Sequence, residues 1–536
     1  GGPQAPSMDT TDSKASVTNS QAAASAESKP LLLGCWNVAG WEATLKYISL
    51  HHASLSAFLD KHQLDIICLQ EMKVTKLKLS EHNAAAQKLG AHGLDGWESY
   101  WSCSPKGFNG CTTFVRKGLT RRADAAPLGQ PALDAEGRCV LTDHGSFVLL
   151  NVYVHSTGGD TDGSRKAKKM EFLNALRAKM VRLRAAGRTV CLAGDLNIVL
   201  RVADGPWKLA SVRVPSLRLG EADHPTETLG AFHQAIGRDG ARALAAALER
   251  RYGLRERLRG HEVFAALGDV FAASADASAE IALLPPSEAA ASSTSTTAGA
   301  PDSDGAVSKK SSGRSSAPAV PGAQVGSSSA RSIPPELLRD SPAVQALRRV
   351  VLELGESCSD KDAVAWLRSV IDEDGMVDTF SALRPHAEGR FTCWDQYKNG
   401  RYANCGRRID YILLDKPLFE SSALAGPPLV EAEDEAGARR AATSNGRWLP
   451  APWSGSSELQ EAPQPTHDSQ FVPPHSGIIY TAPLASDHVA VSLLLRGGTI
   501  PPQTLELDDT TRACSFRPQR SIASFFGQKP SKSQKV

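Results

Sequence analysis

The chain of 536 residues lacks any CxxC pair, and several of its 10 cysteines sit inside apolar runs, as Cys68 does in the run 66–69. This pattern excludes a zinc ribbon and a disulfide framework and indicates buried thiols in a reducing compartment. No apolar run approaches the about 18 residues of a membrane span, and residues 1–30 lack the apolar stretch of a secretory signal. We therefore expect a soluble intracellular protein without membrane contact.

An excess of charge of either sign is also missing, because 60 Lys and Arg stand against 58 Asp and Glu, a formal net charge of +2. This balance excludes a histone-like binder, so any contact with nucleic acid has to come from a local surface. Residues 1–30 and 291–330 contain no aromatic residue and are rich in small and polar residues. Such segments cannot bury enough apolar surface to fold, and we expect disorder there.

The rest of the chain carries the periodicities of strands and helices. Apolar runs predict strands at 31–36, 64–69, 111–116, 138–142, 146–154, 189–193, 390–394, 408–414 and 488–495. Helical spacing occurs at 43–62, 170–183, 229–266 and 335–372. Strands that alternate with both hairpins and helices predict layered α/β packing.

One folded domain is expected over residues 31–497, flanked and interrupted by polar segments. These are tails at 1–30 and 498–536 and insertions at about 205–335, disordered over 273–332, and at 418–480. Without them roughly 270 residues remain, which is compatible with a single domain.

Four short polar motifs follow predicted strands, and a fifth lies within one. They are WNVAG at 36–40, LQEMK at 69–73, GDLN at 194–197, SDH at 486–488 and RIDY at 408–411. Layered α/β proteins place ligand-binding groups at strand ends. Each motif alone is typical of a helix cap, a turn or a surface pair, so the information lies in the ordered series.

This series resembles the exonuclease III-like AP endonucleases of the endonuclease/exonuclease/phosphatase superfamily. The resemblance covers about 31–200, 375–418 and 481–497, and the phrases at 391–394 and 404–411 are most similar to the AP endonuclease 2 branch. It implies a four-layer α/β sandwich of two packed mixed sheets flanked by helices. It also implies a monomeric nuclear enzyme of base excision repair that acts on double-stranded DNA with abasic sites or 3′ ends.

The chemistry of phosphodiester hydrolysis needs an activated water and a group that offsets charge at phosphorus. Mg²⁺ prefers oxygen ligands and uses only one or two protein carboxylates, which makes Glu71 our main ligand, with Mn²⁺ able to substitute. The resemblance implies further metal contacts from Asn37, Asp195, Asn197, Asp487 and His488.

The resemblance also implies catalytic roles for five residues. Asp195 fits the general base, and Asn197 would position the water or a phosphate oxygen. His488 would face the scissile phosphate while Asp410 fixes its tautomer. Tyr153 would donate its hydroxyl to the phosphate.

The pocket for a flipped abasic sugar is aromatic in the dominant family members, whereas the aligned positions here are Cys393, Arg407 and Ile409. A smaller, more polar pocket favours 3′→5′ exonuclease and 3′-phosphodiesterase activity over abasic-site incision. Arg407 is a candidate DNA contact. Phe391 and Trp394 are expected either to stack on a base or terminal sugar or to be core aromatics.

Three positions depart from the family pattern, namely Ala39, Ser156 and Leu200. They leave open a catalytically weak scaffold, and the shared metal chemistry leaves open an inositol-phosphate phosphatase or an RNA deadenylase.

The C-terminal tail carries a second signal. Gln519, Ile522, Phe525 and Phe526 fit the pattern that binds the sliding clamp PCNA, in which an aliphatic residue and two aromatics form a one-turn helical plug. A buried C-terminal helix is the alternative. No Cys/His cluster follows residue 514, so we predict no zinc module there.

Overall fold

The computed structural model of the protein describes most of the segments with strand and helix patterns. The described residues are 1–2, 29–80, 84–91, 94–218, 226–275, 341–385, 387, 389–398, 400–401, 404–424, 474–479 and 481–500. The chain forms two compact units, which we call unit 1 (Gly1–Ala210 and Glu356–Val536) and unit 2 (Ser211–Gly355). The clamp-binding pattern at 519–526 lies outside the described residues.

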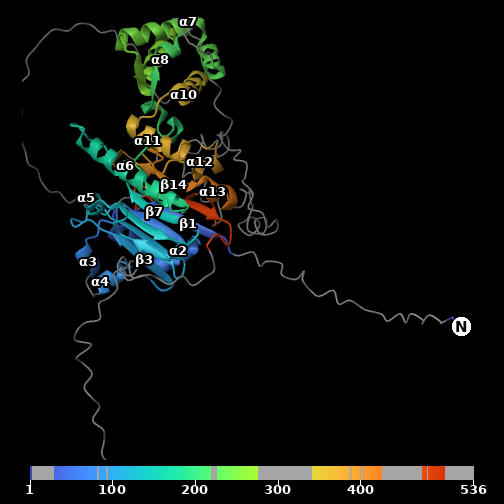
Figure 1. Cartoon of the computed structure of the whole chain (residues 1–536). Coiled ribbons are helices and arrows are strands. Elements are labelled where there is room, and N and C mark those ends of the chain that lie inside the picture. Colours follow the sequence, from blue (N-terminus) through green and yellow to red (C-terminus); the bar gives the residue numbers. More distant parts are fainter. Residues whose placement is uncertain are drawn as a thin grey trace, which may run out of the picture. The chain divides into compact units, whose positions relative to one another are not determined.

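Unit 1 is built on two mixed β-sheets (Figure 1). The first has the order β15 (Ala423–Leu424), β17 (Ala490–Leu495), β1 (Leu31–Asn37), β2 (Ile66–Gln70), β4 (Cys111–Arg116) and β3 (Trp97–Ser102), with β16 (Gly477–Ile479) paired to β17. The second has the order β11 (Met376–Asp378), β14 (Asp410–Asp415), β8 (Val190–Asp195), β7 (Val148–Tyr153), β6 (Cys139–Asp143) and β5 (Arg122–Asp124). A separate two-stranded ladder joins β12 (Cys393–Trp394) to β13 (Gly406–Arg407).

Strand alternation explains how the two sheets pack. In β1, Leu33 and Cys35 belong to one buried cluster, while Leu32 and Trp36 belong to another. The first cluster also contains residues of β7, β8 and β14, so it fills the space between the sheets. Because successive side chains point to opposite faces, these central strands are apolar throughout and each sheet is covered on both faces.

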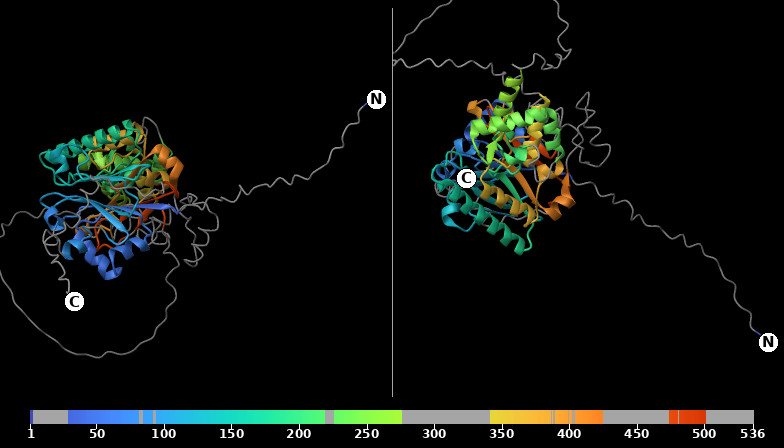
Figure 2. Two further views of the ribbon diagram at one scale, coloured as in Figure 1. Left: turned by 60° about the horizontal axis from the view of Figure 1, so that its bottom comes forward. Right: turned by 90° about the horizontal axis from the view of Figure 1, so that it is seen from above.

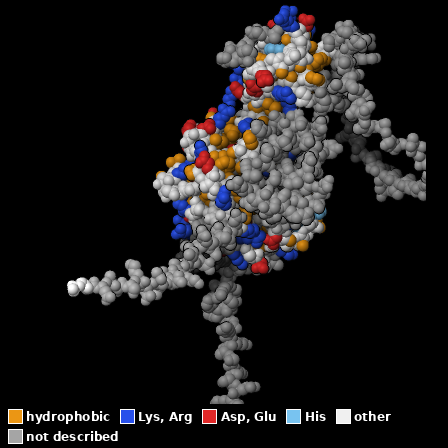
Figure 3. Space-filling view, turned by 90° about the vertical axis from the view of Figure 1, so that its right-hand side faces the viewer, with side chains coloured by type: hydrophobic (Ala, Val, Ile, Leu, Met, Phe, Trp, Pro, Cys, Tyr) orange, Lys and Arg blue, Asp and Glu red, His pale blue; other side chains and the backbone are white. Residues whose placement is uncertain are grey.

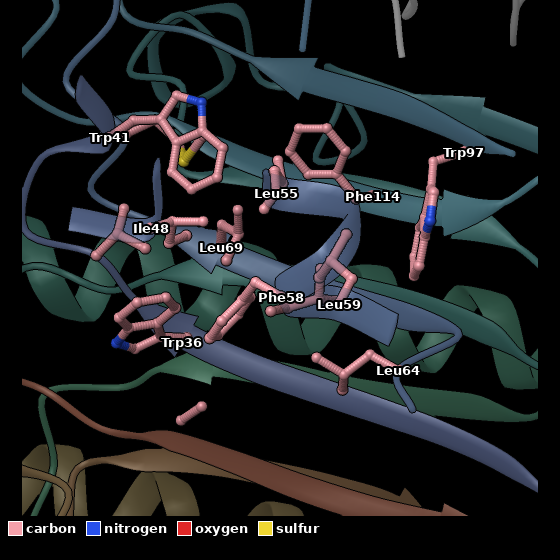
Figure 4. Packing of buried hydrophobic residues seen from close by; sticks show 14 of the residues in the cluster. Trp36, Trp41, Ile48, Leu55, Phe58, Leu59, Leu64, Leu69, Trp97 and Phe114 are labelled. Carbon is pink, nitrogen blue, oxygen red and sulfur yellow. The ribbon is translucent and has the colours of Figure 1, made fainter. Parts of the chain in front are cut away.

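Helices cover the outer faces of both sheets (Figure 2). On the first sheet, α1 (Trp41–His51) and α2 (Leu55–Lys61) pack through Ile48 and Phe58 against Trp36 (Figure 4). On the second, α6 (Ser164–Ala185) and α11 (Lys361–Asp372) contribute Phe172 and Trp366 to a third buried cluster. The layers therefore run helix, sheet, sheet, helix, and the predicted four-layer α/β sandwich is confirmed.

The helical spacing at 43–62 corresponds to two helices rather than one. The chain breaks after α1 because Ala53 adopts a left-handed φ of 54°, and Ser54 then caps α2 by accepting a hydrogen bond from the Ala57 amide at 3.0 Å. Shorter helices of unit 1 are α3 (Lys76–Ser80), α4 (Ala84–Lys88), α5 (Pro131–Asp134), α12 (Thr379–Leu383), α13 (Lys416–Ser422), η1 (Val202–Asp204), η2 (Trp207–Leu209) and η4 (Gln396–Lys398).

Unit 2 is mainly helical. It contains α7 (Glu227–Tyr252), α8 (Gly260–Ala275), α10 (Pro342–Leu354), η3 (Pro215–Leu217) and a ladder of β9 (Ser211–Arg213) with β10 (Arg257–Arg259). The helix expected over 229–266 is therefore interrupted by a strand. The expected disorder over 273–332 begins too early, since α8 continues to Ala275. The predicted insertion at 418–480 also contributes most of α13 together with β15 and β16.

Where the face shown in Figure 3 belongs to described residues, hydrophobic, basic and acidic side chains are intermixed. Among the described residues, none of the helices has both the length and the apolar character that a membrane crossing requires.

Candidate active site

Three polar residues meet where β1, β2 and β8 end. Asn37 is the last residue of β1, Glu71 follows β2, and Asp195 is the last residue of β8. β1 and β2 are parallel neighbours, with Asn37 opposite Gln70, so their carboxyl ends lie at the same edge of the sheet. The Asn37 amide nitrogen donates to Glu71 Oε1 at 3.0 Å and to Asp195 Oδ2 at 2.9 Å. One buried amide thus joins carboxylates that belong to the two different sheets.

A histidine–aspartate pair lies beside these carboxylates. Asp410 begins β14 and stands opposite Asp195 in the antiparallel pairing of β14 with β8. Asp410 Oδ2 is 2.8 Å from His488 Nδ1, and both side chains are buried. Ser486 fixes the loop before β17, since its hydroxyl donates to the Asn37 carbonyl at 2.7 Å and accepts from the His488 amide at 3.1 Å.

The electrostatics of the site follow from this crowding. Burial and the nearby charge of Asp410 raise the pKa of Asp195 to about 7. Burial would lower the pKa of His488, but the charge of Asp410 and its hydrogen bond raise it well above the usual value. The site therefore combines a carboxylate with a near-neutral pKa and an imidazole that favours its charged form, the pairing expected for acid–base chemistry.

Tyr153 and Asn197 complete the rim of the site. Tyr153 ends β7, stands opposite Asp195 in the parallel ladder and is half-buried. Burial and the charges of Glu71 and Asp195 raise its pKa, which keeps the phenol protonated and able to donate. Asn197 has a left-handed φ of 51°, and its amide nitrogen donates to the Val154 carbonyl at 3.0 Å and to Asp195 Oδ2 at 3.2 Å.

The donor set suits a hard divalent cation. Glu71, Asp195 and Asp487 offer carboxylate oxygens, and Asp410 Oδ1 is buried with no hydrogen-bond partner among the described residues. Burial opposes ionisation of Glu71, yet hydrogen bonds from Lys73 and Asn37 lower its pKa and keep it anionic. Oxygen ligands with excess negative charge are what Mg²⁺ requires. The residues present therefore fit a divalent ion, with Glu71 exposed enough to reach it.

The structure brings together most of the residues predicted from the sequence. Hydrogen bonds connect Asn37 to Glu71 and Asp195, and Asn197 to Asp195. The hydrogen-bonded Asp410–His488 pair lies within 4.8 Å of Asp195 by ligand atoms, Asp487 lies within 4.8 Å of His488 in the same sense, and Tyr153 interacts with Glu71.

The three residues predicted to contact DNA differ in their exposure. Phe391 and Trp394 are only 6% and 3% exposed and belong to the cluster between the sheets, so the core role, not stacking on a base, fits their placement. Arg407 is exposed on β13, opposite Cys393, and stays a prediction.

Comparison with known proteins agrees with this arrangement. Residues 34–244 match the model of the Endonuclease/Exonuclease/phosphatase family. This segment of the chain is therefore similar to that family. This segment contains Asn37, Glu71, Tyr153, Asp195 and Asn197, and the fold adds Asp410 and His488 from later in the chain.

The curated proteins that are similar to this chain include AP endonucleases. The chain is 31% identical over 215 residues to DNA-(apurinic or apyrimidinic site) endonuclease 2 of Bos taurus, and 31% identical over 210 residues to that of Homo sapiens. These alignments cover 32% of this chain and 40% and 39% of the relatives, so the chain spans about two-fifths of the length of these relatives. The APE2 catalytic domain of Xenopus laevis aligns over 87% of this chain and 92% of its own, with 18% identity and a TM-score of 0.42. The predicted resemblance to the exonuclease III-like AP endonucleases is confirmed.

Two lysines of unit 1 support the site and were not among the site residues predicted from the sequence. Lys169 belongs to a basic run that reads as a solvated helix face, yet it is buried, and its Nζ donates to the Asn197 carbonyl at 2.7 Å. Lys73 bonds Glu71 Oε2 at 2.9 Å and the Ala39 carbonyl at 2.7 Å. Lys73 does have a sequence signal, since it ends the LQEMK motif.

The three positions that depart from the family pattern do not open the site. Ala39 adopts a left-handed φ of 53°, and its amide donates to Asn37 Oδ1 at 2.9 Å. Leu200 is buried, and its amide lies 3.3 Å from the Tyr411 hydroxyl. Ser156 is exposed, and the neighbouring His155 pairs with Glu136 at 2.7 Å. Hydrogen bonds of the Ala39 and Leu200 amides thus fix the backbone at these two positions.

Proposed function

We propose that this chain is a Mg²⁺-dependent DNA repair nuclease acting in base excision repair in the nucleus. It hydrolyses phosphodiesters at 3′ ends, as a 3′→5′ exonuclease and 3′-phosphodiesterase, and incises DNA more weakly on the 5′ side of abasic sites. The observation that carries this proposal is that Glu71 and Asp195 share the buried Asn37 amide while the ligand atoms of the Asp410–His488 pair lie within 4.8 Å of Asp195. Relatives named as AP endonucleases favour DNA as the substrate.

The side chains divide the work of hydrolysis among them. Asp195, with a pKa near neutrality, accepts the proton of the attacking water, and Asn197 orients that water from two residues away. His488, charged and held by Asp410, donates a hydrogen bond to a phosphate oxygen, and the Tyr153 phenol donates another. Mg²⁺, held by Glu71 with Asn37 and Asp487 nearby, would offset the negative charge of the phosphate when bound.

The preference for 3′ ends rests on the residues that replace the aromatic pocket. Cys393 is half-buried, Ile409 is buried and Arg407 is exposed, so no aromatic ring from these positions lines the site. A flipped sugar gains little stacking there, whereas a terminal 3′ group requires no flipping.

Substitution of the two acidic residues tests the proposal. Asp195→Asn and Glu71→Gln should each lower the rate on a recessed 3′ end about 10²- to 10⁴-fold, because each removes a group that acts on the reacting atoms. Glu42→Gln, at an exposed position of α1, is the matched control and should keep the wild-type rate. Equal, slow turnover by wild type and both variants would instead indicate a catalytically weak scaffold.

A substrate panel then separates the enzyme classes. The purified chain is compared on 3′-recessed DNA, a duplex with one abasic site, poly(A) and inositol phosphates. We expect the fastest turnover on the recessed end and slower incision of the abasic duplex. Dominant turnover of poly(A) or of an inositol phosphate would overturn the choice of DNA.

The C-terminal pattern leads to a further part of the proposal, recruitment of the monomeric enzyme to PCNA through Gln519, Ile522, Phe525 and Phe526. Phe525→Ala combined with Phe526→Ala should abolish PCNA pulldown, because the two rings form the apolar plug. The same variant should keep unstimulated nuclease activity. Retained PCNA binding would reject this recruitment.

A further inference from the structure

Three potential metal ligands lie together at one edge of the site, namely Cys393 and two residues already predicted to contact Mg²⁺, Asp487 and His488. The ligand atoms of Cys393, Asp487 and His488 are all within 4.8 Å of one another. Tetrahedral zinc with bonds of about 2.0–2.3 Å places its ligand atoms about 3.5 Å apart, so closures on the order of 1 Å suffice. Cys393 is the member that distinguishes this group, because a thiol is a poor ligand for Mg²⁺ and a strong one for thiophilic cations.

Backbone pairing holds Cys393 against His488. The two residues form an antiparallel β-bridge, flanked by hydrogen bonds from the Trp394 amide to the Asp487 carbonyl at 3.1 Å and from the Val489 amide to the Thr392 carbonyl at 2.9 Å. These bonds make Cys393 and His488 a non-hydrogen-bonded pair, the type whose side chains approach most closely on one face. The backbone pairing itself therefore places the Cys393 thiol and the His488 imidazole side by side.

The imidazole is also oriented as a metal ligand would be. His488 Nδ1 is hydrogen-bonded to Asp410 Oδ2 at 2.8 Å, which leaves Nε2 as the nitrogen able to bind a cation. A carboxylate behind the imidazole raises its basicity and fixes its ring, as in the carboxylate–histidine–zinc arrangement. Cys393 and Asp487 are both half-buried, so the group is sheltered but reachable from solvent.

We propose that Cys393, Asp487 and His488 form a binding site for a thiophilic divalent cation such as Zn²⁺, and that its occupation inhibits the nuclease. The inhibition rests on the proposed function, because the cation takes the imidazole that would face the phosphate. Binding forms bonds from the metal to sulfur, oxygen and nitrogen, and the thiol proton, together with the second imidazole proton where present, leaves to solvent. A fourth position remains for water.

Binding is tested without reference to catalysis. The full chain, in saturating Mg²⁺, is titrated with Co²⁺ and then with Zn²⁺ while the thiolate-to-cobalt charge-transfer absorption is followed. Wild type should develop the band and lose it to Zn²⁺, and Cys393→Ser and Cys393→Ala should lack it and bind Zn²⁺ at least tenfold more weakly. Cys405→Ser, which changes an exposed cysteine, should match wild type. An undiminished band and affinity in both Cys393 variants, with unchanged melting temperatures, would overturn the site.

Inhibition is tested on the recessed 3′ end, with each variant's rate normalised to its own rate without Zn²⁺. The Zn²⁺ concentration that halves the rate should rise at least tenfold in Cys393→Ser and stay at the wild-type value in Cys405→Ser. Equal inhibition of both variants would overturn the inhibitory role. Absence of any turnover in the wild type would instead refute the proposed function, while the absorption experiment would still decide the metal site.

Discussion

Arg408 is expected to be the most consequential single charge in unit 1. Its guanidinium is 1% exposed and lies between Asp204 and Asp378, which are 2% and 6% exposed. It donates to the two Asp204 oxygens at 2.8 and 2.9 Å and to the two Asp378 oxygens at 3.1 and 2.6 Å. Removal of the cation would leave Asp378 without its buried cation and Asp204 with only the partly exposed Arg201, the situation that makes breaking a buried ion pair far more costly than losing a surface one.

Arg408→Met should therefore lower the free energy of unfolding of unit 1 by about 3–5 kcal/mol. All nine tryptophans lie outside 211–355, so tryptophan fluorescence during urea unfolding reports on unit 1. Arg407→Met, at the exposed neighbouring position, is the matched control and should change the free energy by less than about 0.5 kcal/mol. Activity should fall with stability, since Arg408 precedes by two residues the Asp410 that holds His488.

The acid dependence of stability should change in the same variant. Burial would raise the pKa of Asp204, but the charge and hydrogen bonds of Arg408 lower it to about 2. A depressed folded-state pKa stabilises the fold above the unfolded value of about 3.9, and this contribution, about 2–3 kcal/mol, is lost as the pH falls from about 3.9 through about 2. Arg408→Met should remove most of it and leave only the smaller contribution of Arg201. The reasoning is wrong if Arg408→Met unfolds within 1 kcal/mol of wild type, or if adding Asp204→Asn and Asp378→Asn recovers none of the loss.

Two further predictions concern groups that hold the catalytic residues. Lys169→Met should reduce the turnover number about 10- to 100-fold, because it removes a charge-assisted hydrogen bond of about 1.5–3 kcal/mol to the Asn197 carbonyl. Steady-state kinetics measure this loss against Lys168→Met, which changes an exposed lysine. Equal turnover numbers for the two variants would mean that Lys169 is merely a packing residue. Asp410→Asn should lower the pKa of His488, so the alkaline limb of the pH–rate profile should move to lower pH, and an unmoved limb would contradict the assigned role of the imidazolium.

The strands that carry the site could be predicted because each is a short apolar run followed at once by polar residues. Asn37, Glu71 and Asp195 each lie at or just after the end of such a run, and the rule that ligand groups gather at strand ends then places them together. The helix break at Ala53 could not be predicted in this way, because apolar spacing continues through it and only a left-handed residue followed by a serine cap divides the helix.

Side chains that meet only through the tertiary fold gave no local signal. The sequence around Phe391 and Trp394 is compatible with stacking on a base and with burial in a core. The backbone pairing of residues 392–394 with 487–489 places both rings in the core. Lys169 is one of several basic residues on a helix, and only its register relative to the second sheet turns it inward to the Asn197 carbonyl. Burying an ammonium is costly, as burial lowers the pKa of Lys169 to about 8, and the hydrogen bond to the Asn197 carbonyl together with the charges of Asp195 and Asp360 offsets part of that cost.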